Sequence, residues 1–83
     1  MKKQLFAYKD NSVAFGDPFI QTNEKVAVRE FIGRAQETPR NVLNDIDLYY
    51  LGEYDDETGE VTNENKLLLK GSSIVKESEK DGM

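Results

Sequence analysis

The sequence lacks both cysteine and histidine. Without cysteine the chain has no disulfide bond, thiolate nucleophile or thiolate metal ligand, and without histidine it has no imidazole base or ligand. It also lacks any apolar run near the ~20 residues of a membrane-spanning helix, and its start leads into only a few apolar residues. We therefore expect a soluble, unsecreted protein that is not an enzyme, carries no cofactor or metal and makes no membrane contact.

The chain is short. Its 83 residues suffice for one domain and are too few for two. A chain of this length buries only roughly 60 to 65% of its unfolded surface, so its core is small and its stability modest. Because self-association would bury more surface, we expect a homodimer.

The net charge is negative. There are 11 basic and 16 acidic residues, giving −5, which excludes a polycation that coats nucleic acid through bulk charge. Basic and acidic residues cancel up to residue 50, whereas the acidic residues between positions 53 and 64 have no basic residue among them. Any nucleic-acid site must therefore be local and lie in the first part of the chain.

The chain begins with two predicted strands. Residues 2–8 alternate as a strand does, with no helical repeat. Residues 13–21 are rich in aromatic and β-branched side chains, but Pro18 cannot donate to a sheet ladder. This second segment is therefore predicted to be an edge strand, or a short strand followed by an extended loop.

A helix is predicted at residues 23–37. Thr22 and Asn23 are suitable N-cap residues, and Pro39 ends the helix by forcing the preceding residue out of helical geometry. The apolar residues that repeat at helical spacing are Ala27, Val28, Phe31, Ile32 and Ala35.

The second half predicts a hairpin. Residues 47–54 form a strand with three tyrosines, and residues 55–59 form a turn in which Gly59 has positive φ. Residues 60–62 return along the first strand, and residues 67–70 form a short final strand.

The predicted fold class is α+β. A small antiparallel sheet of three to four strands, in the order strand, strand, helix, strand, strand, has one helix packed on one face. The domain is predicted to span residues 1–70, and residues 71–83 a flexible polar tail.

One helix covers only one face of a sheet, so exposed aromatics on the other face would form a dimer interface or a ligand platform. Single-stranded nucleic acid stacks on such aromatics beside a few cations. The alternative is that the aromatic side chains belong to the hydrophobic core and that the arginines simply occupy the solvent-exposed face of the helix. The candidate DNA-binding residues are Lys2, Lys3, Lys9, Phe15, Phe19, Arg29, Arg34, Arg40, Tyr49 and Tyr50.

Several segments occur together in one order. They are Met-Lys-Lys-Gln-Leu-Phe-Ala-Tyr at the start, Ala14-Phe15-Gly16-Asp17-Pro18-Phe19, Asn23 with Ala27, Arg29 and Phe31, then Asp47-Leu48-Tyr49, Leu51-Gly52-Glu53-Tyr54-Asp55 and Thr58-Gly59. This combination resembles the small nonstructural protein of gokushoviruses, single-stranded DNA bacteriophages of the microvirus family. The resemblance implies DNA binding, a role in the switch from duplex replication to single-stranded genome synthesis, and a location in the host bacterial cytoplasm.

The acidic hairpin supports a different hypothesis. Its residues Glu53, Asp55, Asp56, Glu57 and Glu60 could dock on a basic patch of a phage replication or assembly protein or of a host factor. A calcium loop is excluded, because aligning Gly59 with the glycine of an EF-hand leaves Tyr54 at the first ligand position. DNA binding, protein docking and an obligate dimer that consumes the aromatic face therefore remain open.

Overall fold

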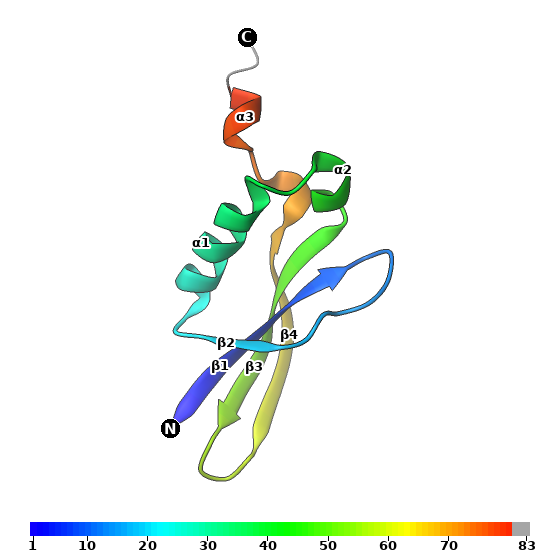
Figure 1. The fold of residues 1–83 in the computed structure, drawn as a ribbon. Coiled ribbons are helices and arrows are strands. Elements are labelled where there is room, and N and C mark those ends of the chain that lie inside the picture. The colour runs from blue at the N-terminus through cyan, green and yellow to red at the C-terminus, as the bar shows by residue number, and fades with distance from the viewer. Residues whose placement is uncertain (81–83) are drawn as a thin grey trace.

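Four antiparallel strands form a sheet in the order β2-β1-β3-β4, with α1 packed on one face (Figure 1). The computed structural model describes residues 1–80. Its elements in chain order are β1 (Lys2–Asp10), β2 (Phe19–Gln21), α1 (Glu24–Ala35), α2 (Arg40–Leu43), β3 (Ile46–Asp55), β4 (Val61–Lys70), the 3-10 turn η1 (Gly71–Ser73) and α3 (Glu77–Lys80).

The α+β class and the antiparallel sheet are confirmed, and the order of elements is corrected. The single predicted helix is joined by the short segments α2, η1 and α3. The strands predicted at residues 60–62 and 67–70 are two parts of β4. The polar stretch between them belongs to an exposed outer strand, where apolar side chains are not required. β2 is the opposite outer strand, as predicted, but it covers only Phe19–Gln21, and residues 13–18 form a loop that precedes the strand instead of following it.

The start of α1 follows from its capping residue. The side chain of Asn23 accepts a hydrogen bond from the backbone N–H of Val26 at 2.9 Å, which satisfies one of the free donors of the first turn. Glu24 places a carboxylate beside the positive end of the helix. The buried face of α1 consists of Ala27, Phe31 and Ala35, and its two alanines allow the helix to approach the sheet closely.

The core lies between α1 and the sheet. Phe6 and Leu48, from the two central strands, are fully buried, and the Phe6 ring centroid is 5.4 Å from that of Tyr50 and 6.1 Å from that of Phe19. Tilted and offset rings at these separations add an electrostatic gain of roughly 0.5–1.5 kcal/mol per pair to the burial of apolar area. The central strands therefore hold the helix mainly through aromatic side chains.

Two glycines shape the β3–β4 hairpin. The turn residue Gly59 has φ 78° and donates to the carbonyl of Asp55 at 2.7 Å, which confirms the predicted turn. Gly52 has φ 144° and lies so close to β4 that a Cβ atom there would overlap the carbonyl oxygen of Thr62. Glycine is thus required at Gly52 for both its dihedral angle and the space around it.

The outer strand β4 is irregular. Tyr50 pairs with Lys66 and Gly52 pairs with Asn63, so β4 contains one more residue than β3 across this interval. Asn65, inside the extra length, has φ 51°, a left-handed conformation that asparagine tolerates better than most residues. This bulge interrupts the regular sequence of backbone donors and acceptors along the outer edge.

The chain after β4 packs on the domain. Gly71 is buried and Ile74, 6% exposed, belongs to the core. Arg40 binds this segment: its guanidinium donates to the carbonyl of Ile74 at 2.7 Å and to the Glu79 carboxylate at 2.9 and 2.5 Å. Packing therefore continues past residue 70, where the sequence placed the domain boundary. Residues 81–83 of the predicted tail lie outside the described residues.

The Arg40–Glu79 pair gives a pH prediction. Hydrogen bonds from the Arg40 side chain and the Lys76 backbone lower the pKa of Glu79 to about 2 from its usual 4.5. A depressed carboxyl pKa stabilises the fold above pH 4.5, and this stabilisation is lost as the pH falls toward 2. Arg40→Gln is expected to raise the pKa of Glu79 toward 4.5, as measured by carboxyl NMR titration. It is also expected to flatten the pH dependence of the free energy of unfolding between pH 2 and 4.5, as measured by urea denaturation.

Arg29→Gln, at an exposed arginine of α1, serves as the control and should leave the Glu79 titration unchanged. A Glu79 pKa that stays near 2 in Arg40→Gln would contradict the assignment.

Candidate nucleic-acid interface

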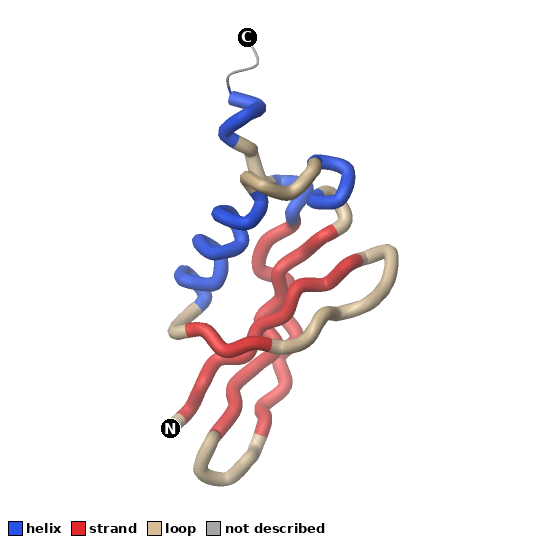
Figure 2. Tube along the Cα trace, viewed as in Figure 1, coloured by secondary structure: helices blue, strands red, loops and turns tan. Residues whose placement is uncertain are grey.

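The sheet has one face that α1 does not cover. Along β1, Phe6 and Tyr8 contact the helix side, because Tyr8 lies 5.1 Å from the Phe31 ring of α1. Alternation along a strand then directs Leu5, Ala7 and Lys9 to the opposite side. Figure 2 shows α1 running along one side of the strands. We call the other side the open face.

An aromatic pair beside a lysine lies on the open face. The rings of Phe15 and Tyr49 meet edge to face, with centroids 5.0 Å apart and an interplanar angle of 76°. The ammonium of Lys9 lies 5.4 Å from the Phe15 centroid and 6.0 Å from the Tyr49 centroid, within cation–π range. We call these three residues the Lys9 cluster. The cluster therefore places a positive charge beside two aromatic rings that stand nearly perpendicular to each other.

Strand register and a backbone bridge assemble the Lys9 cluster. Tyr49 lies opposite Ala7, which precedes Lys9 by two residues and therefore shares its face of β1. Phe15 reaches the same place through an isolated antiparallel bridge to Lys9. The loop that carries Phe15 is held by hydrogen bonds of 2.9 Å from Asp10 N–H to the Ala14 carbonyl and 2.8 Å from Gly16 N–H to the Tyr8 carbonyl.

Two exposed apolar side chains and a second lysine lie on the same face as the cluster. Ile20, opposite Leu5, is 50% exposed, and Leu67, opposite Tyr49, is 40% exposed. Lys70 pairs across the strands with Asp47, as does Lys9 from the other side. The carboxylate of Asp47 is buried between these two lysines and accepts a hydrogen bond from the Asn11 side chain at 2.9 Å.

Other predicted site residues are not part of the open face. Phe19 and Tyr50 pack on Phe6 in the core, so the predicted platform of four aromatics is corrected to the pair Phe15 and Tyr49. The physical reason is strand alternation, which places the adjacent residues Tyr49 and Tyr50 on opposite faces.

The arginines also lie elsewhere. Arg29 and Arg34 are carried by α1, on the far side of the sheet from the Lys9 cluster. The guanidinium of Arg34 lies 5.8 Å from the Tyr8 ring centroid. Arg40 forms hydrogen bonds with Ile74 and Glu79 of the C-terminal segment and does not belong to the Lys9 cluster.

The two lysines nearest the start of β1 face the acidic hairpin. Lys2 Nζ is 4.0 Å from a Glu53 oxygen, and Lys3 Nζ is 3.5 Å from an Asp56 oxygen. The Met1 ammonium donates to the same Asp56 carboxylate at 2.7 Å, and this hydrogen bond lowers the pKa of Asp56. Lys2 and Lys3 therefore balance the hairpin more than they extend the Lys9 cluster.

Sequence reasoning missed three open-face residues, Ile20, Leu67 and Lys70. Their positions depend on the pairing register, which no local pattern specifies for an irregular strand. Among residues 1–80 no three acidic side chains come together as metal ligands. No helix in the described part of the chain is long and apolar enough to cross a membrane.

The fold and this surface define a small α+β sheet protein with one open aromatic face. Comparison with known proteins identifies its family: the model of the phage ORF5 protein family matches residues 3–74. The chain therefore belongs to the phage ORF5 protein family and is a bacteriophage protein. No curated protein and no solved structure matches it.

Proposed function

We propose that this phage protein is a gokushovirus accessory protein that binds single-stranded DNA through the open face. It acts in the host bacterial cytoplasm during viral genome replication or the switch to single-stranded genome synthesis. The observation that carries the proposal is the Lys9 cluster, in which Phe15 is 41% exposed beside Tyr49 and an ammonium group. Membership of a phage family and the resemblance to gokushovirus nonstructural proteins support it.

The chemistry suits single strands better than duplex DNA. Unpaired bases stack on exposed aromatic rings, and each stacked base contributes roughly 1–3 kcal/mol. Lys9 and Lys70 provide two ammonium groups at the same end of the sheet for the phosphate backbone. The nearby apolar side chains of Ile20 and Leu67 extend the surface on which bases can rest.

The acidic hairpin is too distant to repel DNA from this site. Glu53, the hairpin acid nearest to the site along the strands, lies opposite Gln4, and Asp47 lies opposite Lys9, so five strand positions separate them. At about 3.3 Å per residue the separation is about 16 Å, twice the screening length of about 8 Å in physiological salt. The negative net charge therefore limits the site to the far end of β1 without excluding it.

The test measures the affinity of a fluorescent oligothymidine by anisotropy at two salt concentrations. Tyr49→Ala is expected to weaken binding at least about fivefold, since a stacking contact of about 1 kcal/mol is lost. Lys9→Gln is expected to weaken binding and to reduce the slope of log affinity against log salt by about 0.7, the value for one phosphate contact with a single strand.

Arg29→Gln is the matched control, because it removes an exposed cation from the helix side and leaves the open face intact. The proposal fails if the protein does not bind the oligonucleotide at low salt. It also fails if Tyr49→Ala and Lys9→Gln bind as tightly as the unchanged chain.

A second candidate function is protein docking through the acidic hairpin. Glu57 at its tip has a side chain that is 81% exposed, and its 3.7 Å contact with the Met1 ammonium leaves it open to a basic partner. Glu57→Lys combined with Glu60→Lys should abolish capture of the purified phage replication protein without changing the circular dichroism spectrum. Undiminished capture would reject this function.

The homodimer belongs to the same proposal. The exposed apolar side chains of Ile20 and Leu67 provide the surface on which a second copy would pack. Sedimentation analysis with and without oligothymidine distinguishes the arrangements. A dimer that dissociates when DNA binds shares the open face with DNA, whereas a dimer that persists uses another surface.

A further inference from the structure

A cleft lies on the opposite side of the sheet from the Lys9 cluster, where the end of α1 and α2 meet the sheet. Its volume is about 250 Å³, just below the range of roughly 300–1,000 Å³ typical of pockets for drug-sized ligands. Phe31, Val42, Leu43 and Ile46 make most of its wall. The polar groups come from Tyr8, Arg34 and Thr38, and the Thr38 hydroxyl already donates to the Arg34 carbonyl at 2.9 Å. A second hollow of about 380 Å³ shares Tyr8 and Arg34 and continues toward β2.

The first polar group is the hydroxyl of Tyr8. Its oxygen is buried and has no hydrogen-bond partner among residues 1–80. Buried hydroxyls are normally hydrogen-bonded, because losing water without gaining a partner is unfavourable. Burial also raises the pKa of this hydroxyl, so the phenol remains a neutral donor. A ligand atom that accepts its proton would satisfy the hydroxyl.

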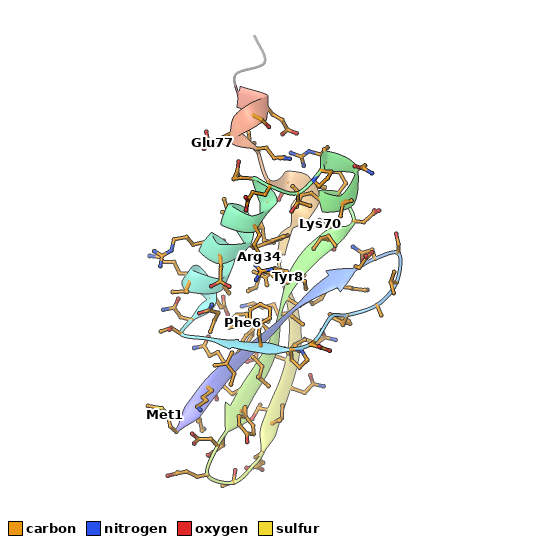
Figure 3. The ribbon with its side chains drawn as sticks, in the orientation of Figure 1. Met1, Phe6, Tyr8, Arg34, Lys70 and Glu77 are labelled. Carbon is orange, nitrogen blue, oxygen red and sulfur yellow. The ribbon has the colours of Figure 1, made fainter. Side chains whose placement is uncertain are left out.

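The second polar group is the guanidinium of Arg34. It forms no ion pair within the described residues and lies over the Tyr8 ring, 5.8 Å from the centroid (Figure 3). The acidic residue one turn earlier on α1, Glu30, lines the second hollow, and its carboxylate accepts a hydrogen bond from the Gln21 side chain of β2 at 2.6 Å. Arg34 therefore presents a positive charge beside an apolar wall.

Together these observations describe a site for one negative charge on an apolar body. We infer that the cleft binds a small organic carboxylate, aromatic or aliphatic, whose carboxylate pairs with Arg34 and accepts from the Tyr8 hydroxyl. The hydrocarbon part packs on Phe31, Val42 and Ile46, and Val42, at 45% exposed, leaves the entrance open to solvent. A single guanidinium and one neutral donor match a monoanion better than a phosphate dianion, which requires more donors.

The inference is independent of DNA binding, and its test uses the full chain. Sodium benzoate and sodium hexanoate are titrated into isotope-labelled protein, with sodium chloride holding ionic strength constant. Resonances of Phe31, Val42 and Leu43 are expected to shift and saturate with a Kd below about 1 mM. Benzamide, which has the same shape and no charge, is expected to bind at least about tenfold more weakly.

Two variants locate the charge and the hydroxyl. Arg34→Gln should weaken benzoate binding at least about tenfold, whereas Arg29→Gln, on the same helix, should not change it. Tyr8→Phe should weaken binding several-fold while the protein stays folded, because it removes a hydroxyl that has no partner in the free protein. Equal binding of benzamide and benzoate, an unchanged affinity in Arg34→Gln, or no saturation by either acid would overturn the inference.

Discussion

Replacing Gly52 by alanine is expected to lower the free energy of unfolding by at least about 3 kcal/mol, because two costs act at the same residue. Its φ of 144° lies where alanine is strained, and a Cβ atom would overlap the Thr62 carbonyl oxygen of β4. The clashing atoms belong to the backbone, so a side-chain movement cannot relieve the overlap. A domain of this size is stabilised by only roughly 4–12 kcal/mol, so the loss is a large share. Urea denaturation measures it directly.

Gly33→Ala is the matched control. Gly33 lies inside α1, and a Cβ atom there would have no neighbour within 4 Å. Alanine inside a helix stabilises the folded state by about 0.5–1 kcal/mol relative to glycine, so this variant should have a higher free energy of unfolding than the unchanged chain. A Gly52→Ala protein as stable as Gly33→Ala would show that β3 and β4 are not as close as described.

Replacing Phe6 by alanine is expected to lower the free energy of unfolding by about 3–5 kcal/mol, a large share of the stability of a domain of this size. Phe6 is fully buried and packs on Phe19 and Tyr50, so its loss creates a cavity between α1 and the sheet. The unfolding transition should move to lower denaturant with an unchanged slope. Near-ultraviolet circular dichroism provides a second measurement of the packing among these rings.

Phe15→Ala makes the same chemical change on the open face. Phe15 is 41% exposed and meets only one ring, that of Tyr49, so the expected cost is about 1 kcal/mol or less. The variant should remain folded while losing oligothymidine affinity, which separates binding from stability. A Phe15→Ala protein as unstable as Phe6→Ala would place Phe15 in the core and contradict the open face.

Local features of the fold could be predicted because each has a nearby cause. Asn23 caps α1 through a residue three positions away, and Gly59 closes the hairpin turn through Asp55. Pro18 predicted an outer strand, and it lies immediately before the outer strand β2, where its missing backbone donor costs no sheet hydrogen bond. Such effects act within a few residues and are visible in the sequence.

The candidate site could be predicted only in part. The sequence supplied Lys9, Phe15 and Tyr49, and alternation alone already separates Tyr49 from Tyr50. It could not place Arg40, whose partners Ile74 and Glu79 lie more than thirty residues away and depend on how the chain returns past the sheet. Exposed side chains on β4 were missed for the same reason, because their neighbours follow from a bulged register.

The two outer strands determine how copies of this protein can meet. β2 pairs over three residues only, and β4 carries a bulge with Asn65 in a left-handed conformation. A short edge and a distorted edge are poor templates for strand addition, so the sheet is not expected to grow from molecule to molecule into fibrils. Where copies associate, they are expected to do so face to face, in assemblies that close. The edges of the sheet therefore favour closed assemblies over open-ended chains of molecules.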